Sequence, residues 1–115
     1  MKYIGETKNM IVEKLLNEIT QFQNETFPTS TPISKLHHLS REVPELIAEL
    51  DHGNGTLNDI EMEYADCLLL LFGSATKRGM TAKDIKRVIK AKIEINKKRT
   101  WGKPDTQGVV QHVKD

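Results

Sequence analysis

The stretch from Leu57 to Lys77, LNDIEMEYADCLLLLFGSATK, constrains the fold more than any other part of the sequence. It contains the longest apolar run, Cys67 to Phe72, and places Glu63 and Asp66 just before that run. On an α-helix, residues at positions i and i+3 lie on the same face, so these two carboxylates lie together. A charge beside a core is costly unless another group pairs with it. We therefore expect the most buried helix of the protein to have a polar site at its edge.

Apolar residues recur at three- and four-residue spacing in four segments, which predicts an all-α bundle with short turns. The predicted helices lie near residues 7–26, 31–51, 57–77 and 82–98. Their expected N-caps are Thr7 or Asn9, Thr31, Thr56 and Thr81. In the third helix, the residues expected to face the core are Ile60, Tyr64, Cys67, Leu68, Leu71, Phe72 and Ala75.

Prolines and glycines mark local changes in the backbone. Pro28 ends the first helix, and Pro32 suits the first position of the second. Pro44 lies inside the second helix and predicts a kink or local unwinding near Ser40. From about residue 100, WGKPDTQGVVQHVKD predicts an irregular tail that is ordered or partly ordered, with at most a short strand at residues 108–113.

Length and charge narrow the function classes. The 115 residues predict a single domain, and the net charge of +1 argues against a nucleic-acid partner. No apolar run approaches the ~20 residues of a membrane-spanning helix, and the N-terminus lacks a signal-peptide pattern, so we expect a cytoplasmic protein with no membrane partner. The single cysteine, Cys67, excludes an intrachain disulfide and is expected to be buried and inert.

Two carboxylate pairs suggest a metal site. Glu42 and Glu45 have the same i, i+3 spacing as Glu63 and Asp66, and the two pairs lie on consecutive predicted helices joined by a short turn. Such helices pack antiparallel, so the pairs can face each other and form a cage of four carboxylates. Ligands that are all oxygen suit Mg²⁺ or Mn²⁺. The acidic face also includes His38 and Glu49.

Three alternatives to a magnesium or manganese site are considered for the same acidic residues. Carboxylates at helical spacing are often only a solvated face. A di-iron bundle would need a Glu-x-x-His repeat, and neither His37 nor His38 follows a glutamate at that spacing. The third alternative is a non-catalytic helical interaction module, whose acidic and basic faces would bind other proteins.

The pattern Glu42-x-x-Glu45 followed by Glu63-x-x-Asp66 resembles the signature of the MazG-like all-α nucleoside triphosphate pyrophosphohydrolases. The segments KLHHLSREVPELIAEL, EYADCLLLLFGSATKRGMTAKDI and KIEINKKRTWGKPDTQGVVQHVKD are similar to the dATP/dGTP pyrophosphohydrolase branch, which is common in phages and prophages. The likeness covers roughly residues 33–113. The chain departs from many relatives in having Arg41 where they have a second acid, and in having Pro44 between the first two acids.

The resemblance implies a four-helix, MazG-like fold and Mg²⁺-dependent hydrolysis of a nucleoside triphosphate, with dATP and dGTP as the expected substrates. The products would be the monophosphate and pyrophosphate. It also implies that Glu42, Glu45, Glu63 and Asp66 are metal ligands or hold the attacking water. The expected substrate-binding residues are Lys92, Asn96, Arg99 and Trp101. Family members assemble as dimers or tetramers, so a homo-oligomer is expected.

Overall fold

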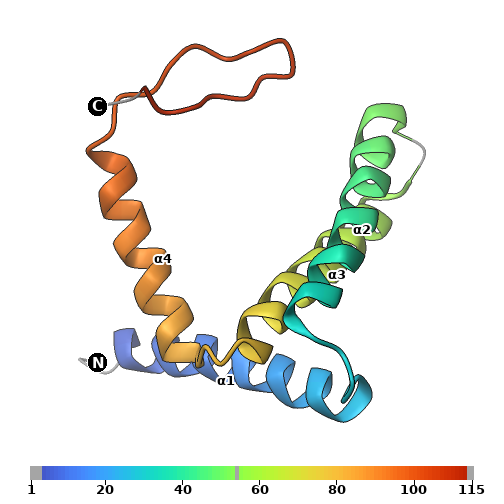
Figure 1. Ribbon diagram of the computed structural model, residues 1–115, viewed down its shortest axis with the longest axis vertical. Coiled ribbons are helices and arrows are strands. Elements are labelled where there is room, and N and C mark those ends of the chain that lie inside the picture. Colours follow the sequence, from blue (N-terminus) through green and yellow to red (C-terminus); the bar gives the residue numbers. More distant parts are fainter. Residues whose placement is uncertain (1–3, 54, 114–115) are drawn as a thin grey trace. The chain divides into compact units, whose positions relative to one another are not determined.

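The computed structural model describes the backbone of residues 4–53 and 55–113, and side chains from Ile11 onward within those ranges. The chain contains the helices α1 (Ile4–Thr26), α2 (Pro32–His52), α3 (Leu57–Lys77) and α4 (Ala82–Lys97), followed by an irregular tail (Figure 1). No strand occurs in the described ranges, where Trp101 and His112 form an isolated bridge. The expected all-α fold with an irregular tail is confirmed. None of the described helices is long and apolar enough to cross a lipid bilayer.

The helix ends agree with the expected ends to within three residues. The largest difference is at α1, which begins at Ile4, so Thr7 and Asn9 lie inside the helix and cannot cap its start. The side chains of these two residues lie outside the described ones. The possible short strand at residues 108–113 is not found, because the only ladder pairing of this segment in the described ranges is the isolated bridge between Trp101 and His112.

The chain divides into two compact units, Met1–Lys83 and Asp84–Asp115. The first unit contains α1, α2 and α3, and the second contains most of α4 together with the tail. The expectation of a single domain stays a prediction.

Local interactions explain where α2 and α3 begin. The Thr31 hydroxyl accepts a hydrogen bond from Ser34 N, and the Ser34 hydroxyl accepts one from Thr31 N, so the two residues satisfy each other's backbone groups. Thr56 and Asp59 form the same reciprocal pair at the start of α3. Gly53 ends α2 with a φ of +62°, a conformation that glycine adopts without steric cost. The caps expected at Thr31 and Thr56 are therefore confirmed.

The helix α2 continues without interruption through Pro44. Of the kink or local unwinding expected near Ser40, the unwinding is not found, because the residues around it remain helical, and the kink stays a prediction. Pro44 has no backbone N–H to donate to the carbonyl of Ser40, one turn earlier. The Ser40 hydroxyl donates to the His37 carbonyl at 2.6 Å, a local bond that is compatible with the helical backbone.

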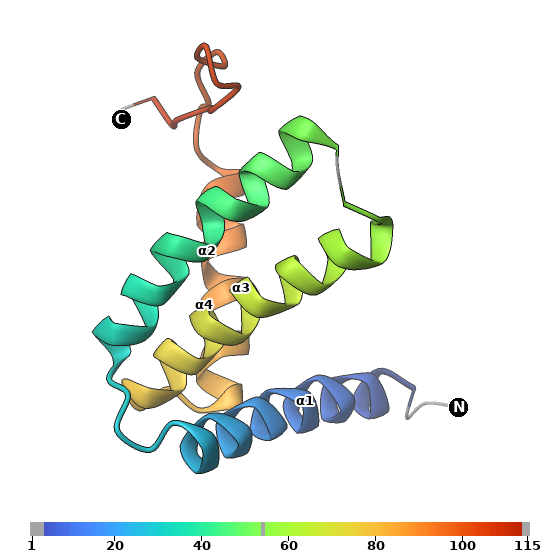
Figure 2. The same cartoon turned by 90° about the vertical axis from the view of Figure 1, so that its right-hand side faces the viewer.

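In the first unit, α2 and α3 run antiparallel as a helical hairpin, and α1 packs against α3 (Figure 2). Leu16 of α1 and Leu46 of α2 are buried, as are the polar side chains of Gln23, Lys35 and Ser74. The Ser74 hydroxyl donates to the Pro32 carbonyl at 2.8 Å, which ties α3 to the first turn of α2.

Among the described side chains, α3 is the most buried helix, as expected, because about half of its residues are buried or half-buried, a larger share than in α1, α2 or α4. Its buried residues are Gly73 and Ser74, whereas Tyr64, Leu68 and Leu71 are each about half exposed. Cys67 is only half-buried. The reason is that the apolar residues of α3 extend around more of its circumference than α1 and α2 cover.

The second unit has an ordered tail after α4. The Trp101 indole Nε1 donates to the Asn96 carbonyl at 3.1 Å, and the Trp101 ring meets His112 edge to face. Asp105 Oδ1 accepts hydrogen bonds from Gln107 N and Val109 N, which closes the turn at the far end of the tail. These bonds fix the tail onto the end of α4 without regular secondary structure.

Candidate metal centre

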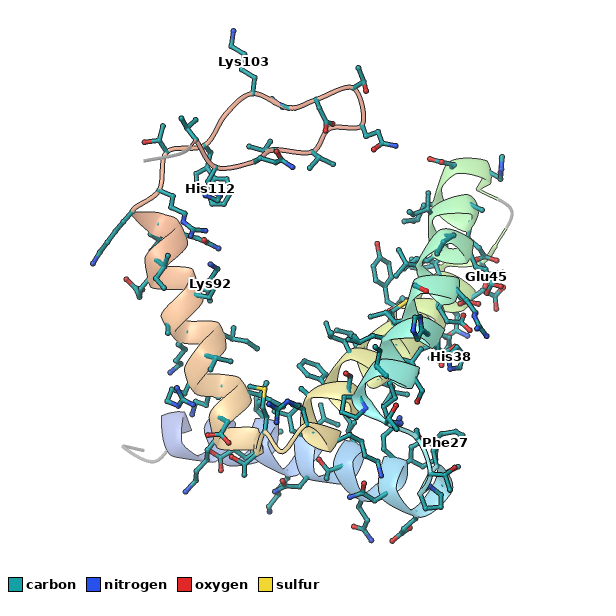
Figure 3. The ribbon with its side chains drawn as sticks, in the orientation of Figure 1. Phe27, His38, Glu45, Lys92, Lys103 and His112 are labelled. Carbon is teal, nitrogen blue, oxygen red and sulfur yellow. The ribbon has the colours of Figure 1, made fainter. Side chains whose placement is uncertain are left out.

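Three carboxylates from two helices meet in the first unit. Glu42 and Glu45 of α2 and Glu63 of α3 each offer an oxygen, and these three oxygens lie within 4.8 Å of one another. Figure 3 labels Glu45 on α2, in the region where α2 runs beside α3. Oxygens that ligate one divalent cation at 2.0–2.6 Å lie at most about 4–5 Å apart, so this spacing fits a shared ion.

Asp66 lies close to this cluster but is not one of its three members. It lines a cavity together with Glu42, and its charge acts on Glu63. Its side chain is exposed. The structure thus brings together three of the four predicted acids within the distance of a single ion and places the fourth beside them.

The electrostatics of Glu63 show that the cluster has an excess of negative charge. Burial raises the pKa of Glu63 above its ordinary value, and the carboxylates of Glu42, Asp66, Glu49 and Glu45 raise it further. Glu63 Oε2 is buried without a hydrogen-bond partner. Among the described residues, no lysine or arginine forms an ion pair with these acids, and only His38 Nε2 approaches, at 3.1 Å from Glu42 Oε1.

Glu49 is a fifth acid that the carboxylate pattern did not include among the ligands. It contributes to the raised pKa of Glu63, and its own Oε2 is buried without a hydrogen-bond partner. Glu49 approaches the backbone at Gly55 so closely that a Cβ there would lie 2.6 Å from Oε2. Its position one turn after Glu45, on the same acidic face, was the signal for its presence.

The donor set suits a hard divalent cation. All the candidate ligands are carboxylate oxygens, which Mg²⁺ and Mn²⁺ prefer, and a buried oxygen without a partner is a group that a cation would satisfy. A solvated acidic face would not leave the Glu63 oxygen buried and unpartnered. The geometry therefore favours a metal centre over a solvated face.

A cavity of about 280 Å³ lies next to these carboxylates. Its lining combines the carboxylates of Glu42 and Asp66 with apolar and aromatic side chains from α1 and α3: Phe22, Leu69 and Leu70. A second cavity of about 200 Å³ includes Ser30, Ser34 and Lys35. Gln23, Phe27, His38 and Leu70 line both, so the two cavities are neighbours.

The expected substrate-binding residues lie in the second unit. Arg99 Nη1 donates to Asn96 Oδ1 at 3.2 Å and Trp101 donates to the Asn96 carbonyl, so these three form one group at the end of α4. Lys92 is exposed on α4 (Figure 3). Their role in binding substrate stays a prediction.

Comparison with known proteins identifies relatives over most of the chain. Residues 15–115 match the family model of the dATP/dGTP pyrophosphohydrolases. The chain is 32% identical over 102 residues to a dATP/dGTP diphosphohydrolase of Cyanophage S-2L, covering 89% of this chain and 88% of the relative.

A solved structure resembles the fold as well. It is the Cyanophage S-2L MazG-like pyrophosphohydrolase bound to dGDP and three catalytic Mn²⁺ ions per active site. The TM-score is 0.70 at 29% identity, and the match covers 90% of this chain and 97% of the other. The match favours an enzyme over an interaction module. With the family model matching nearly the whole sequence, the chain belongs to the dATP/dGTP pyrophosphohydrolase family and is a MazG-like hydrolase.

Proposed function

We propose that this enzyme hydrolyses dATP and dGTP to the corresponding monophosphate and pyrophosphate, with Mg²⁺ or Mn²⁺ as cofactor. The observation that carries the proposal is the cluster of Glu42, Glu45 and Glu63, whose oxygens lie within 4.8 Å without a lysine or arginine in the described ranges to pair with them. The family and the activity named for the cyanophage relative supply the substrate class.

Glu42, Glu45, Glu63 and Asp66 are the proposed metal ligands. Glu42, Glu45 and Glu63 have the spacing to share one ion, and Asp66 is close enough to Glu63 to raise its pKa. A bound divalent cation would offset the charge of the triphosphate and make the α-phosphorus easier to attack. Glu49 adds negative charge from one turn further along α2 and is a further candidate ligand.

The proposed hydrolysis requires no covalent intermediate with the carboxylates. Water attacks the α-phosphorus in line, the bond from that phosphorus to the bridging oxygen breaks, and pyrophosphate leaves. One carboxylate orients the water and accepts its proton. Asp66 is the candidate for this role, because its side chain is exposed at the cavity wall beside Glu42.

Lys92, Asn96, Arg99 and Trp101 are proposed to bind the substrate through its phosphates and sugar. The hydrogen bond from Arg99 Nη1 to the Asn96 side chain orients the Arg99 guanidinium, a planar donor that suits phosphate oxygens.

We also propose that the enzyme works as a homo-oligomer, either a dimer or a tetramer. Large apolar side chains remain exposed on every helix, among them Ile11, Leu15, Ile47, Leu68, Leu71 and Ile89. Covering this surface with a second copy would gain roughly 25 cal/mol for each Å² removed from water. Light scattering at working concentration tests this, and a monomer would contradict it.

The test of the metal centre uses Glu63→Gln and Asp66→Asn, with Glu61→Gln as the matched control on an exposed position of the same helix. Pyrophosphate release from dATP and dGTP is measured with Mg²⁺ and with Mn²⁺. Glu63→Gln and Asp66→Asn should each lose at least about 100-fold in kcat, because each removes a group that acts in the transition state. The control should retain wild-type turnover.

Melting temperatures separate a catalytic role from a structural one. If the acids are held for a cation, removing one charge relieves repulsion and should leave the metal-free protein as stable as wild type or more stable. Mg²⁺ with nucleotide should then stabilise wild type more than either variant. Near wild-type turnover in Glu63→Gln or Asp66→Asn would refute the proposed centre.

A further inference from the structure

Lys35 is a buried cation with no anionic partner among the described residues. It lies on α2 with only 3% of its surface exposed. Its ammonium donates a hydrogen bond to Gln23 Oε1 and lies 5.2 Å from the centre of the Phe27 ring. No carboxylate in the described ranges forms an ion pair with it. Burial lowers the pKa of Lys35, and the charge of Lys77 lowers it further.

A buried ammonium group without an anionic partner lowers the stability of the folded protein. An ammonium group has three N–H donors, and Gln23 is the hydrogen-bond acceptor found for it. A buried charge with unsatisfied donors destabilises a fold unless a ligand or a partner satisfies them. Gln23, itself 3% exposed, is engaged with Lys35. The remaining donors of Lys35 are therefore suited to a ligand with oxygen or nitrogen acceptors.

The location of Lys35 indicates which part of a nucleotide it could meet. Lys35 lines the 200 Å³ cavity, and this cavity shares Gln23, Phe27, His38 and Leu70 with the one that contains Glu42 and Asp66. A nucleotide with its phosphates at the carboxylates would have its base within reach of the shared walls. Those walls include an aromatic side chain, Phe27, and apolar surface, which suit a base better than a triphosphate.

We propose that Lys35, positioned by Gln23, recognises the nucleobase and donates a hydrogen bond to the O6 and N7 edge of guanine. This inference rests on the proposed function, because it assumes a purine nucleotide with its phosphates at the acidic cluster. Neither residue belongs to the carboxylate pattern or to the substrate-binding group at the end of α4.

The chemistry of the two purines gives the direction of selectivity. Guanine presents two acceptors side by side, O6 and N7, whereas adenine presents the acceptor N7 beside the donor N6. Lys35 can only donate, and the Oε1 acceptor of Gln23 is already occupied by Lys35. Adenine would therefore place its N6 donor against a donor, and dGTP should be hydrolysed with a higher kcat/KM than dATP.

The experiment compares Lys35→Met with wild type on dGTP, dITP, dATP and dCTP. Methionine keeps most of the length and the apolar stem of lysine and removes the donor. dITP retains O6 and N7 but lacks the 2-amino group, so it isolates the proposed contact. Lys35→Met should lower kcat/KM for dGTP and dITP by about 10- to 100-fold, the usual effect of losing a hydrogen bond to a charged group. The values for dATP and dCTP should change by less than about threefold.

Lys77→Met is the matched control. Lys77 acts on Lys35 through its charge but lines neither cavity. If Lys77→Met lowered kcat/KM selectively for dGTP and dITP, the electrostatic field around Lys35 would be responsible for the selectivity. That result would overturn the proposal. The proposal would also be overturned if Lys35→Met lowered kcat/KM equally for all four substrates, since a phosphate contact or a purely structural role affects all nucleotides alike. An unchanged kcat/KM would overturn it as well.

Two further measurements keep the test decisive. If Lys35→Met does not fold, Gln23→Glu takes its place: the new carboxylate would pair with Lys35, hold its donors, and reduce turnover of dGTP and dITP selectively. If wild type hydrolyses none of the nucleotides, the proposed function fails. Base recognition is then tested by calorimetric binding of dGMP and dAMP, which needs no hydrolysis. Tighter binding of dGMP that is lost in the variant supports the inference, and equal binding of the two overturns it.

Discussion

Replacing Gly73 with alanine tests whether the buried Gln23–Lys35 pair is held in place by close packing. A Cβ at position 73 would lie 2.9 Å from Gln23 Cδ and 3.0 Å from its Oε1. The first distance is shorter than Cβ contacts in proteins, and the second is tighter than nearly all of them, so Gln23 would have to shift. Gln23 is almost fully buried and bonded to Lys35, so it has little room to move away.

The magnitude follows from three opposing terms. Alanine is favoured over glycine inside a helix by about 1 kcal/mol. Overpacking costs about 1–3 kcal/mol, and loosening a hydrogen bond to a charged group costs about 1.5–3 kcal/mol. Taking the lower half of these ranges, the variant loses about 2 kcal/mol of unfolding free energy. For a chain of this length, that corresponds to a fall of about 8 °C in Tm.

The decisive control is a double-mutant cycle with Gln23→Ala. In that background the three atoms nearest to the added methyl group of Gly73→Ala, all from the Gln23 side chain, are gone, and we expect the helix-propensity gain to dominate. Gly73→Ala should then raise the Tm by about 4 °C instead of lowering it, which is a coupling of about 3 kcal/mol between the two positions. The Tm of wild type, the two single variants and the double variant is measured under the same conditions without metal. If Gly73→Ala stabilises the wild-type protein, Gln23 is not closely packed against α3.

Three further predictions concern the caps, the acidic cluster and the tail. Thr31→Ala should lower the unfolding free energy by about 1 kcal/mol in urea denaturation, because the N-terminus of α2 loses its hydroxyl acceptor, whereas Thr31→Ser should cost little. Because the pKa of Glu63 is raised in the folded state, folding favours its protonated form, so the Tm without metal should fall as pH rises from mildly acidic through that pKa. Glu63→Gln should flatten this dependence of Tm on pH, and saturating Mg²⁺ should reverse it, since a cation binds the ionised form. A wild-type Tm that does not change with pH would contradict the raised pKa of Glu63. Trp101→Phe removes the hydrogen bond to the Asn96 carbonyl and should increase amide exchange at Gly102 and Val113, whose backbone bonds close the tail, without changing exchange in α2.

The four helices, the caps at Thr31 and Thr56, and the grouping of Glu42, Glu45 and Glu63 as acids of consecutive helices could be predicted from the sequence. These features depend on local rules: a 3.6-residue period, hydroxyl caps and the i, i+3 spacing of carboxylates. The family likeness also came from short stretches of sequence, and the match to residues 15–115 confirmed it.

How these parts meet depends on tertiary packing. Only the pairing of α2 with α3 brings Glu63 to Glu42 and Glu45, leaves Asp66 at the cavity beside them and adds Glu49. No sequence pattern indicated that Gln23 and Lys35 meet, because they lie on different helices and their contact depends on the small volume of Gly73 on a third. Periodicity also overstated the burial of Tyr64, Leu68 and Leu71 on α3, since it shows which faces are apolar but not how much of each face a single chain can cover.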